Sequence, residues 1–249
     1  MNILSKLLKS KKCFVSPNPF INKLEVYKEP CNSIIFVDCL YDVSFFSPSL
    51  FELFQIFLSN QIKGSVAKRQ AEFLAGRIAA KLAVTTLTEL GNIEIKVGNN
   101  REPIWPEGII GSISHTNSRA ICVVGKSDNI EGLGIDIEYI LNKSSISDIQ
   151  QFIHNQEELN LITEQGLSES LGTTIIFSAK ESFFKGVFPQ VGEIFGFECA
   201  RVMKVDLSEN KLILRISDTL VKKNNLKNKY IVWFEYDFTS VTTLLIVNN

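Results

Sequence analysis

The chain has 249 residues, of which 45% are hydrophobic, and a formal net charge of -1. This length can form one large domain or two small ones with real cores, and the near-neutral charge argues against a protein that binds nucleic acid through a basic surface. The five cysteines show no Cys-x-x-Cys spacing, which favours reduced thiols in a cytoplasm over a disulfide framework or a zinc site. They are Cys13, Cys31, Cys39, Cys122 and Cys199.

The first segment, MNILSKLLKSKKC, is basic, but Lys6 and Lys9 interrupt its apolar run before it reaches the length of a signal-peptide core. We expect a frayed terminus, with a short interfacial helix as the alternative. No later stretch has the roughly 20 uncharged apolar residues of a membrane span, so no transmembrane segment is expected.

The hydrophobic pattern of the first half predicts a strand over residues 34–40, a helix over 49–57, a long helix over 66–90 that stops at Gly91, and strands over 93–97, 109–114 and 120–124. On the long helix, Arg69, Phe73 and Arg77 recur at intervals of four beside Gly76. Two aligned guanidiniums next to a glycine could hold a phosphate, and a solvated basic face is the alternative.

The second half predicts a strand over residues 133–138, two helices between 146 and 165, a helix over 173–188, and an antiparallel meander with strands over 197–205, 211–216, 230–237 and 241–247. Helices followed by strands therefore occur twice. This order indicates an α+β protein made of two similar halves, residues 1–128 and 129–249.

The stretch LGIDIE, residues 133–138, alternates aliphatic residues with Gly134, Asp136 and Glu138, as in a half-buried strand. Two carboxylates on one side of a strand repel each other unless a hard cation lies between them, so Asp136 and Glu138 are a candidate Mg²⁺ site. A solvated strand edge is the alternative.

In the helix over residues 173–188, Glu181 and Lys185 lie four residues apart. They could form a surface ion pair. Because the helix is apolar over most of its circumference, we expect this face to be covered instead. Glu181 would then be a third carboxylate of the metal site, and Lys185, with Lys180 as a second cation, would bring positive charge to a bound phosphate.

Ser114 and His115 are adjacent on a strand and point to opposite faces, which excludes a serine-hydrolase triad built on this pair. His115 stands at a strand end before a turn, where it could hydrogen-bond a phosphate. A structural histidine is the alternative.

The motifs GSISH, GIDIE and FSAKESFFK, in this order and spacing, resemble those of the surfactin-type 4'-phosphopantetheinyl transferases. KRQAEFLAGRIAAK, REPIWPEGIIGSISH and FSAKES are most like the subgroup that serves enterobactin-like siderophore synthetases. The resemblance covers residues 69–197. It implies an α+β fold of two pseudo-two-fold related halves, each with helices on a small, mainly antiparallel sheet, and an active site at their junction.

The resemblance also implies a role for each matching residue. Asp136, Glu138 and Glu181 match the Mg²⁺ ligands, Lys185 the diphosphate contact and Lys180 a second such contact. In the first half, Arg69 and Arg77 match contacts to the nucleotide end of coenzyme A. Arg101 and His115 match contacts to its 3'-phosphate, and Ser114 matches a residue that lines the ligand.

The implied reaction is attack by a serine hydroxyl of an acyl, aryl or peptidyl carrier protein on the β-phosphorus of coenzyme A, which releases adenosine 3',5'-bisphosphate. Glu138, or Glu181 through an ordered water, would accept the proton. Residues 186–197 would expose aromatic side chains that dock an amphipathic helix of the carrier. A cytoplasmic monomer is expected, and the rival hypotheses are a Mg²⁺-dependent phosphohydrolase of a nucleotide and a non-catalytic module that binds coenzyme A or a carrier.

Overall fold

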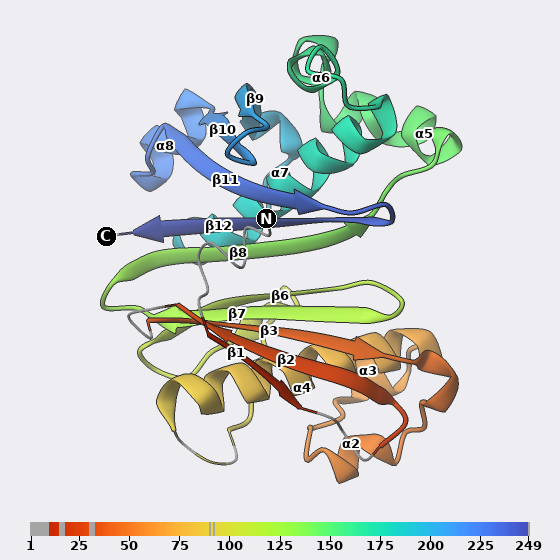
Figure 1. The fold of residues 1–249 in the computed structure, drawn as a ribbon. Helices are drawn as coiled ribbons and strands as arrows, with labels where there is room; N and C mark the ends of the chain where they lie inside the picture. The colour runs from red at the N-terminus through yellow and green to blue at the C-terminus, as the bar shows by residue number, and fades with distance from the viewer. Residues whose placement is uncertain (1–9, 15–17, 30–32, 90, 92, 249) are drawn as a thin grey trace. The chain divides into compact units, whose positions relative to one another are not determined.

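The computed structural model describes residues 10–14, 18–29, 33–89, 91 and 93–248. Cys31 and residues 1–9 of the predicted frayed terminus MNILSKLLKSKKC lie outside the described residues, whereas its residues 10–13 belong to a strand (Ser10–Phe14), so the prediction was wrong there. The chain divides into two compact units between Glu131 and Gly132, three residues after the boundary that the sequence predicts. Each unit combines helices with a five-stranded sheet, so the predicted α+β class is confirmed (Figure 1).

The first unit contains a five-stranded antiparallel sheet in the order β1-β2-β3-β7-β6. Its strands are β1 (Ser10–Phe14), β2 (Ile21–Lys28), β3 (Ile34–Tyr41), β6 (Ile109–His115) and β7 (Arg119–Lys126), and a separate short ladder pairs β4 (Lys96–Val97) with β5 (Pro103–Ile104). The helices are α2 (Leu50–Leu53), α3 (Asn60–Lys63) and α4 (Ala67–Thr88), with a 3₁₀ turn η1 (Val43–Phe45). Helix α4 packs on β3 and β7 through small and aliphatic side chains such as Leu74 and Ala75.

Three predicted boundaries in this unit were wrong. The helix expected over residues 49–57 ends at Leu53, because Gln55 adopts a left-handed backbone conformation with φ 54° that a helix cannot continue. Helix α4 ends at Thr88, where Glu89 and not Gly91 takes the left-handed capping conformation. The strand expected over residues 93–97 is paired only at Lys96–Val97.

The second unit contains a sheet in the order β8-β12-β11-β10-β9, in which β9 to β12 form the predicted antiparallel meander. The strands are β8 (Ile130–Tyr139), β9 (Ala200–Asp206), β10 (Lys211–Ile216), β11 (Lys229–Tyr236) and β12 (Ser240–Asn248). The helices are α5 (Lys143–Ile153), α6 (Gln156–Thr163), α7 (Glu169–Val191) and α8 (Asp218–Asn224), with a 3₁₀ turn η2 (Phe197–Cys199).

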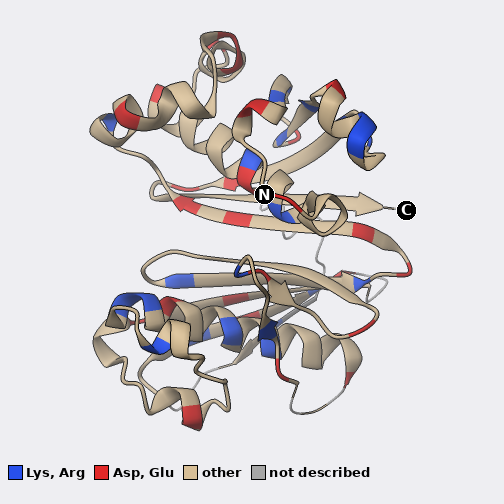
Figure 2. Ribbon diagram, turned by 180° about the vertical axis from the view of Figure 1, so that it is seen from behind, with Lys and Arg blue, Asp and Glu red and all other residues tan. Residues whose placement is uncertain are grey.

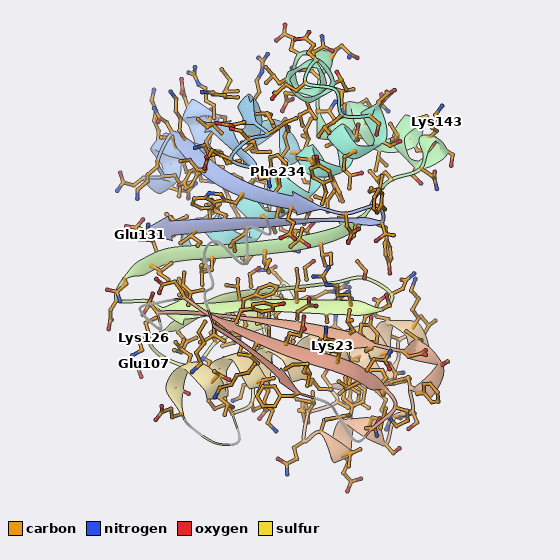
Figure 3. The ribbon with its side chains drawn as sticks, viewed as in Figure 1. Lys23, Glu107, Lys126, Glu131, Lys143 and Phe234 are labelled. Carbon is orange, nitrogen blue, oxygen red and sulfur yellow. The ribbon has the colours of Figure 1, made fainter. Side chains whose placement is uncertain are left out.

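Helix α7 packs on β12 and β11 and closes the core of the second unit. Phe183 and Val187 of α7 are buried with Leu245 of β12 and with Phe234 of β11, which is labelled in Figure 3. This packing fixes the face of α7 that lies on the sheet. None of the described helices is long and apolar enough to cross a membrane.

Candidate active site

Strand β8 presents its acidic residues on the side where α7 lies. A Cβ on Gly134 would overlap the carbonyl oxygen of Ser182 and lie 2.8 Å from the Gly186 nitrogen, so only glycine allows α7 to come this close. Because side chains alternate along a strand, Asp136 and Glu138 project to the same side as Gly134. The acidic residues of β8 are red in Figure 2.

Helix α7 brings a lysine onto this acidic side. Ser168 caps its first turn through the N–H of Leu171, and Gly192 ends it in a left-handed conformation. Lys185 Nζ lies 2.6 Å from Oδ1 of Asp136, whose residue is only 1% exposed. The predicted face of α7 is therefore partly covered, and Lys185 pairs with Asp136 of β8.

The three carboxylates influence one another electrically. Burial, followed by the charge of Asp136, raises the pKa of Glu138 to about 7, while Lys185 opposes the rise and Glu181 adds to it. Burial also raises the pKa of Glu181, where Lys185 opposes and Asp136 adds. Lys185 opposes both shifts, and further positive charge would stabilise the ionised forms of Glu138 and Glu181.

This donor set has the chemistry that Mg²⁺ requires, since hard divalent cations take oxygen ligands from carboxylates. In the described part of the chain, however, no three His, Cys, Asp or Glu side chains converge closely enough to hold an ion as they stand. The three acids suit Mg²⁺ because their oxygens are ligands that it prefers and because a cation would offset the repulsion between their charges. The ion itself remains a prediction for this chain.

In the first unit, His115 lies in a network with two residues of α4. Arg69 Nη1 is 2.8 Å from His115 Nε2, which places Nε2 as the acceptor and the ring proton on Nδ1. Glu72 Oε2 lies 3.7 Å from Nδ1 and 3.4 Å from the same Arg69 nitrogen. The missing side chain of Gly76 allows α4 to lie close to β6, because a Cβ at this position would lie only 3.1 Å from Ile113 Cγ2. The sequence-based interpretation omitted Glu72, although its spacing of three from Arg69 was visible.

Arg77 lies apart from this network, on the wall of a cavity of about 290 Å³. The residue is 5% exposed, and its Nη1 is buried without a hydrogen-bond partner among the described residues. The guanidinium lies 5.0 Å from the ring centroid of Phe73, and burial lowers its pKa to about 10, so it stays charged at neutral pH. A solvated basic face, the alternative weighed above, is therefore wrong for Arg77.

The rest of this cavity combines two lysines and one acid, Glu94, with apolar and polar side chains. Lys81 and Lys96 line it together with Phe73 and with the segments 55–59 and 93–97. Arg69, Arg101, Ser114 and His115 do not. The structure thus gives the predicted nucleotide-end residues two places, the Arg69–His115 network and the Arg77 cavity.

Three other predicted contacts have different surroundings. Lys180 is 3% exposed, and its Nζ lies 2.8 Å from Glu158 Oε1 and donates to the Ile153 carbonyl oxygen at 2.6 Å. Lys180 therefore ties α7 to α6 and α5, and this position leaves it no reach to a diphosphate. Arg101 is exposed in a turn with φ 68°, and Ser114 is buried in β6.

The aromatic residues expected on the surface over residues 186–197 are packed instead, which corrects that prediction. Phe195 lies 5.0 Å from Phe184 and 5.8 Å from Phe183 between ring centroids, and Phe197 lies 5.6 Å from Phe177. Only Ile194 remains a strongly exposed large apolar side chain in this segment, at 77%.

Comparison with known proteins decides the family. Residues 58–125 match the family model for the 4'-phosphopantetheinyl transferase N-terminal domain, and residues 132–234 match the model for the 4'-phosphopantetheinyl transferase superfamily. The chain is also 32% identical to enterobactin synthase component D of Salmonella typhimurium over 187 residues, 75% of each chain. This chain belongs to the 4'-phosphopantetheinyl transferase superfamily. The two models include α4, β6, β8 and α7, the elements that carry the residues described above.

Other members of the superfamily match over shorter stretches. Enterobactin synthase component D of Escherichia coli K12 is 39% identical over 126 residues, 50% of this chain and 58% of the relative. The 4'-phosphopantetheinyl transferase PptT of Mycobacterium tuberculosis is 32% identical over 144 residues, 57% of this chain and 61% of the relative. The chain thus spans between about three fifths and three quarters of the length of these transferases.

Proposed function

We propose that this chain transfers the 4'-phosphopantetheine group of coenzyme A to a serine hydroxyl of an acyl, aryl or peptidyl carrier protein. The observation that carries the proposal is the group formed by β8 and α7, in which Lys185 pairs with Asp136 and its charge acts on Glu138 and Glu181. Cleaving a diphosphate requires negative charge to be neutralised as the leaving group departs; Lys185 supplies positive charge directly, and the three carboxylates would do so through a bound divalent cation.

Bound Mg²⁺, held by Asp136, Glu138 and Glu181, would neutralise the diphosphate and position it for in-line attack. Lys185 would donate hydrogen bonds to the diphosphate and stabilise the departing adenosine 3',5'-bisphosphate. Its 26% exposed side chain can reach a ligand, whereas the buried Lys180 cannot, so we leave Lys180 out of the proposed ligand set.

Two carboxylates are candidates to accept the serine proton, Glu138 directly and Glu181 through a water. Burial and Asp136 raise the pKa of Glu138 to about 7 in the absence of a metal, and bound Mg²⁺ would lower it again, so both carboxylates stay candidates. Positioning supplies the rest of the acceleration, since a carboxylate remains a weak base for an alcohol.

The first unit is proposed to bind the nucleotide end of coenzyme A. Arg77 lines a cavity with aromatic and aliphatic sides, which suits a phosphate next to a purine, and its Nη1 is buried without a hydrogen-bond partner among the described residues. Arg69, which donates to the neutral His115 ring, is a second cationic point, and His115 and Arg101 remain proposed 3'-phosphate contacts. Ser114 remains a proposed lining residue.

The names of the relatives suggest the pathway. Because several of them are components of enterobactin synthase, we propose that the carrier belongs to a siderophore-producing or other nonribosomal peptide synthetase. We place the enzyme in the cytoplasm as a monomer, in keeping with its free cysteines Cys13, Cys39, Cys122 and Cys199.

Intact-mass spectrometry tests the transfer. An unmodified aryl or peptidyl carrier protein is incubated with the full chain, coenzyme A and Mg²⁺, beside Glu181→Ala and the matched control Glu169→Gln, an exposed glutamate of the same helix. We expect the carrier to gain one phosphopantetheine group with the wild type and the control, and none with Glu181→Ala or with EDTA. Consumption of coenzyme A without carrier modification would support a phosphohydrolase, and retention of intact coenzyme A would support a binding module.

A further inference from the structure

Three hydroxyl groups lie in the contact between α7 and β12, which is otherwise apolar. Ser178 and Ser182 of α7 face Thr243 of β12, and all three residues are fully buried. Val241 and Leu245, the neighbours of Thr243 on the same side of β12, belong to the apolar core. Buried hydroxyls cost stability unless each finds a partner, and a fully bonded group fixes one arrangement of the elements that carry it. We call Ser178, Ser182 and Thr243 the hydroxyl clamp.

The hydroxyl of Thr243 uses its proton and both of its lone pairs. It donates to the Ser178 carbonyl oxygen at 2.8 Å, and its Oγ1 lies 2.9 Å from Ser178 Oγ and 2.6 Å from Ser182 Oγ. Because its one proton goes to the carbonyl, the two serine hydroxyls are the donors to Thr243 Oγ1. Ser182 Oγ also lies 3.1 Å from the Thr243 carbonyl oxygen. The clamp therefore binds two successive turns of α7 to one residue of the sheet.

Ser182 is the point at which α7 meets two neighbouring strands. Its hydroxyl bonds to Thr243 of β12, and its carbonyl oxygen lies so close to Gly134 of β8 that a Cβ on Gly134 would overlap it. Apolar contacts are non-directional, so they resist a small slide or rotation of a helix only weakly, whereas hydrogen bonds depend on distance and angle. The clamp thus sets the height and the rotation of α7 on β8 and β12.

Glu181 lies directly before Ser182 and is fixed from both sides along the helix. Before it, Lys180 is buried and its Nζ lies 2.8 Å from Glu158 Oε1 of α6. Successive residues of a helix are about 100° apart around its axis, so these two buried neighbours leave Glu181 a single direction, away from both contacts. Glu181 itself is only partly buried. Its carboxylate can therefore move only if α7 moves.

We propose that Ser182 and Thr243 are positioning residues that hold Glu181 in place for metal binding, acting through the backbone of α7. This inference rests on the proposed function, in which Glu181 is a ligand of Mg²⁺. Valine at position 243 keeps the shape of threonine but puts a methyl group where Oγ1 lies, and a methyl carbon needs about 3.5 Å to a neighbouring atom. Ser182 Oγ is only 2.6 Å from that position. In Thr243→Val the helix must therefore shift at Ser182, and Glu181 shifts with it.

The test measures metal binding by the full chain with saturating coenzyme A. Mn²⁺ is the probe, electron paramagnetic resonance detects the free ion, and binding to coenzyme A without protein is subtracted. Thr243→Val is compared with Thr243→Ser, which keeps the hydroxyl, and with the matched control Thr173→Val. Thr173 is a fully buried threonine of the same helix, about two turns before Glu181, and its Oγ1 lies 2.9 Å from His154 Nε2. The control removes a comparable buried hydrogen bond outside the clamp.

Thr243→Val should weaken Mn²⁺ binding at least about tenfold, as for other residues that orient a metal ligand, while Thr243→Ser and Thr173→Val stay within about threefold of the wild type. In the transfer assay, kcat of Thr243→Val should fall by a similar factor. The KM for coenzyme A should stay within about threefold, because the proposed contacts to the nucleotide end lie in the first unit. Thermal unfolding of each variant confirms that it is folded.

Ser182→Ala decides the case if Thr243→Val does not fold, because alanine favours the helix and this change removes only the bonds of Ser182 to Thr243. It should weaken Mn²⁺ binding as well. The proposal is overturned if the folded clamp variants bind Mn²⁺ like the wild type, if Thr173→Val or Thr243→Ser loses as much affinity, or if the wild type binds no Mn²⁺ beyond that held by coenzyme A.

The metal readout needs no carrier protein, so the positioning role and the proposed transfer can fail separately. Carrier modification that is unchanged in Thr243→Val and Ser182→Ala would contradict the positioning role alone. A wild type that binds Mn²⁺ in a clamp-dependent way but modifies no carrier would contradict the proposed transfer and support the positioning role.

Discussion

Arg77 holds its charge where burial opposes it, and its Nη1 has no hydrogen-bond partner in the described residues. Because the folded state gains little from that charge, Arg77→Met should leave the melting temperature unchanged or raise it. Binding of coenzyme A should weaken roughly tenfold to a hundredfold, the equivalent of about 1.5–3 kcal/mol for a hydrogen bond to a charged group. Calorimetric titration and thermal unfolding measure the two effects. Lys126→Met is the control. If Arg77→Met unfolds the chain, or if it binds coenzyme A as well as this control does, the assignment of Arg77 to the coenzyme A site is wrong.

Glu72 is a positioning residue for His115 and Arg69, because its carboxylate lies between Nδ1 of the ring and the guanidinium. In Glu72→Gln, the charge that favours the Nδ1–H tautomer is lost while the shape is kept. The KM for coenzyme A should rise about threefold to tenfold with little change in kcat. Steady-state kinetics separates these two constants, and an effect confined to kcat would contradict the assignment.

His154 should make stability sensitive to acid. Burial lowers its pKa despite the backbone hydrogen bond to Asn155, so the folded state prefers the neutral ring. The unfolded state therefore takes up a proton first, and stability falls as the pH drops below the unfolded value of about 6.5 and levels off below the folded pKa. The melting temperature of the wild type should drop more between pH 7.5 and pH 5.5 than that of His154→Gln, two pH values chosen to lie roughly either side of that value. Equal drops would show that His154 does not contribute.

At the scale of elements, the contact between α7 and β8 depends on Gly134. A Cβ at this position would overlap Ser182 O, so Gly134→Ala must push the helix off the strand and separate Lys185 from Asp136. We expect a loss of stability of about 1–3 kcal/mol, as for other overpacked cores, and a larger loss of transfer activity. Urea unfolding checks the first effect. Gly64→Ala is the control, since the nearest atom to its Cβ would be 3.7 Å away, and it should behave as the wild type.

Sequence patterns located α4 and α7 because each has a long apolar periodicity, although the predicted stop at Gly91 was wrong and α7 runs from Glu169 to Val191 and not over 173–188. They could not show which polar residues of α7 are covered, since this helix is apolar over most of its circumference. Lys180 is the case in point: its partner Glu158 belongs to another helix, and only the packing of α6 on α7 brings the two charges together.

Short elements were predicted less well, for physical reasons. The strand β2 was missed because Asn22, Lys23 and Glu25 break its apolar alternation, although its core-side residues Ile21 and Val26 are buried. Helix α8 was missed because seven residues carry too little periodicity to distinguish a helix from a turn. Neither element carries a proposed ligand, so these errors left the site unaffected.

For the whole molecule, the site residues that could be predicted are those whose spacing is local. Asp136 and Glu138 are two residues apart on a strand, and Glu181 and Lys185 are four apart on a helix. Lys185 and Asp136 form an ion pair although they are 49 residues apart in the sequence, and no periodicity in the sequence specifies this pair. Tertiary packing, including the glycine contacts of β8, sets that distance.

The assignment of the nucleotide end to the first unit and of the diphosphate to the second predicts how the full chain responds to its ligands. Hydrogen–deuterium exchange reports local opening, which a bound ligand suppresses in the segments it contacts. Coenzyme A alone should protect α4 and β6, because Arg69, Arg77 and His115 need no metal. Adding Mg²⁺ should extend protection to β8 and α7, where the three acids otherwise repel one another. In Asp136→Asn, the protection of β8 and α7 by Mg²⁺ should be lost, and the protection of α4 and β6 by coenzyme A should be retained. Protection of all four elements by coenzyme A alone would show that the acids need no cation to accept the diphosphate.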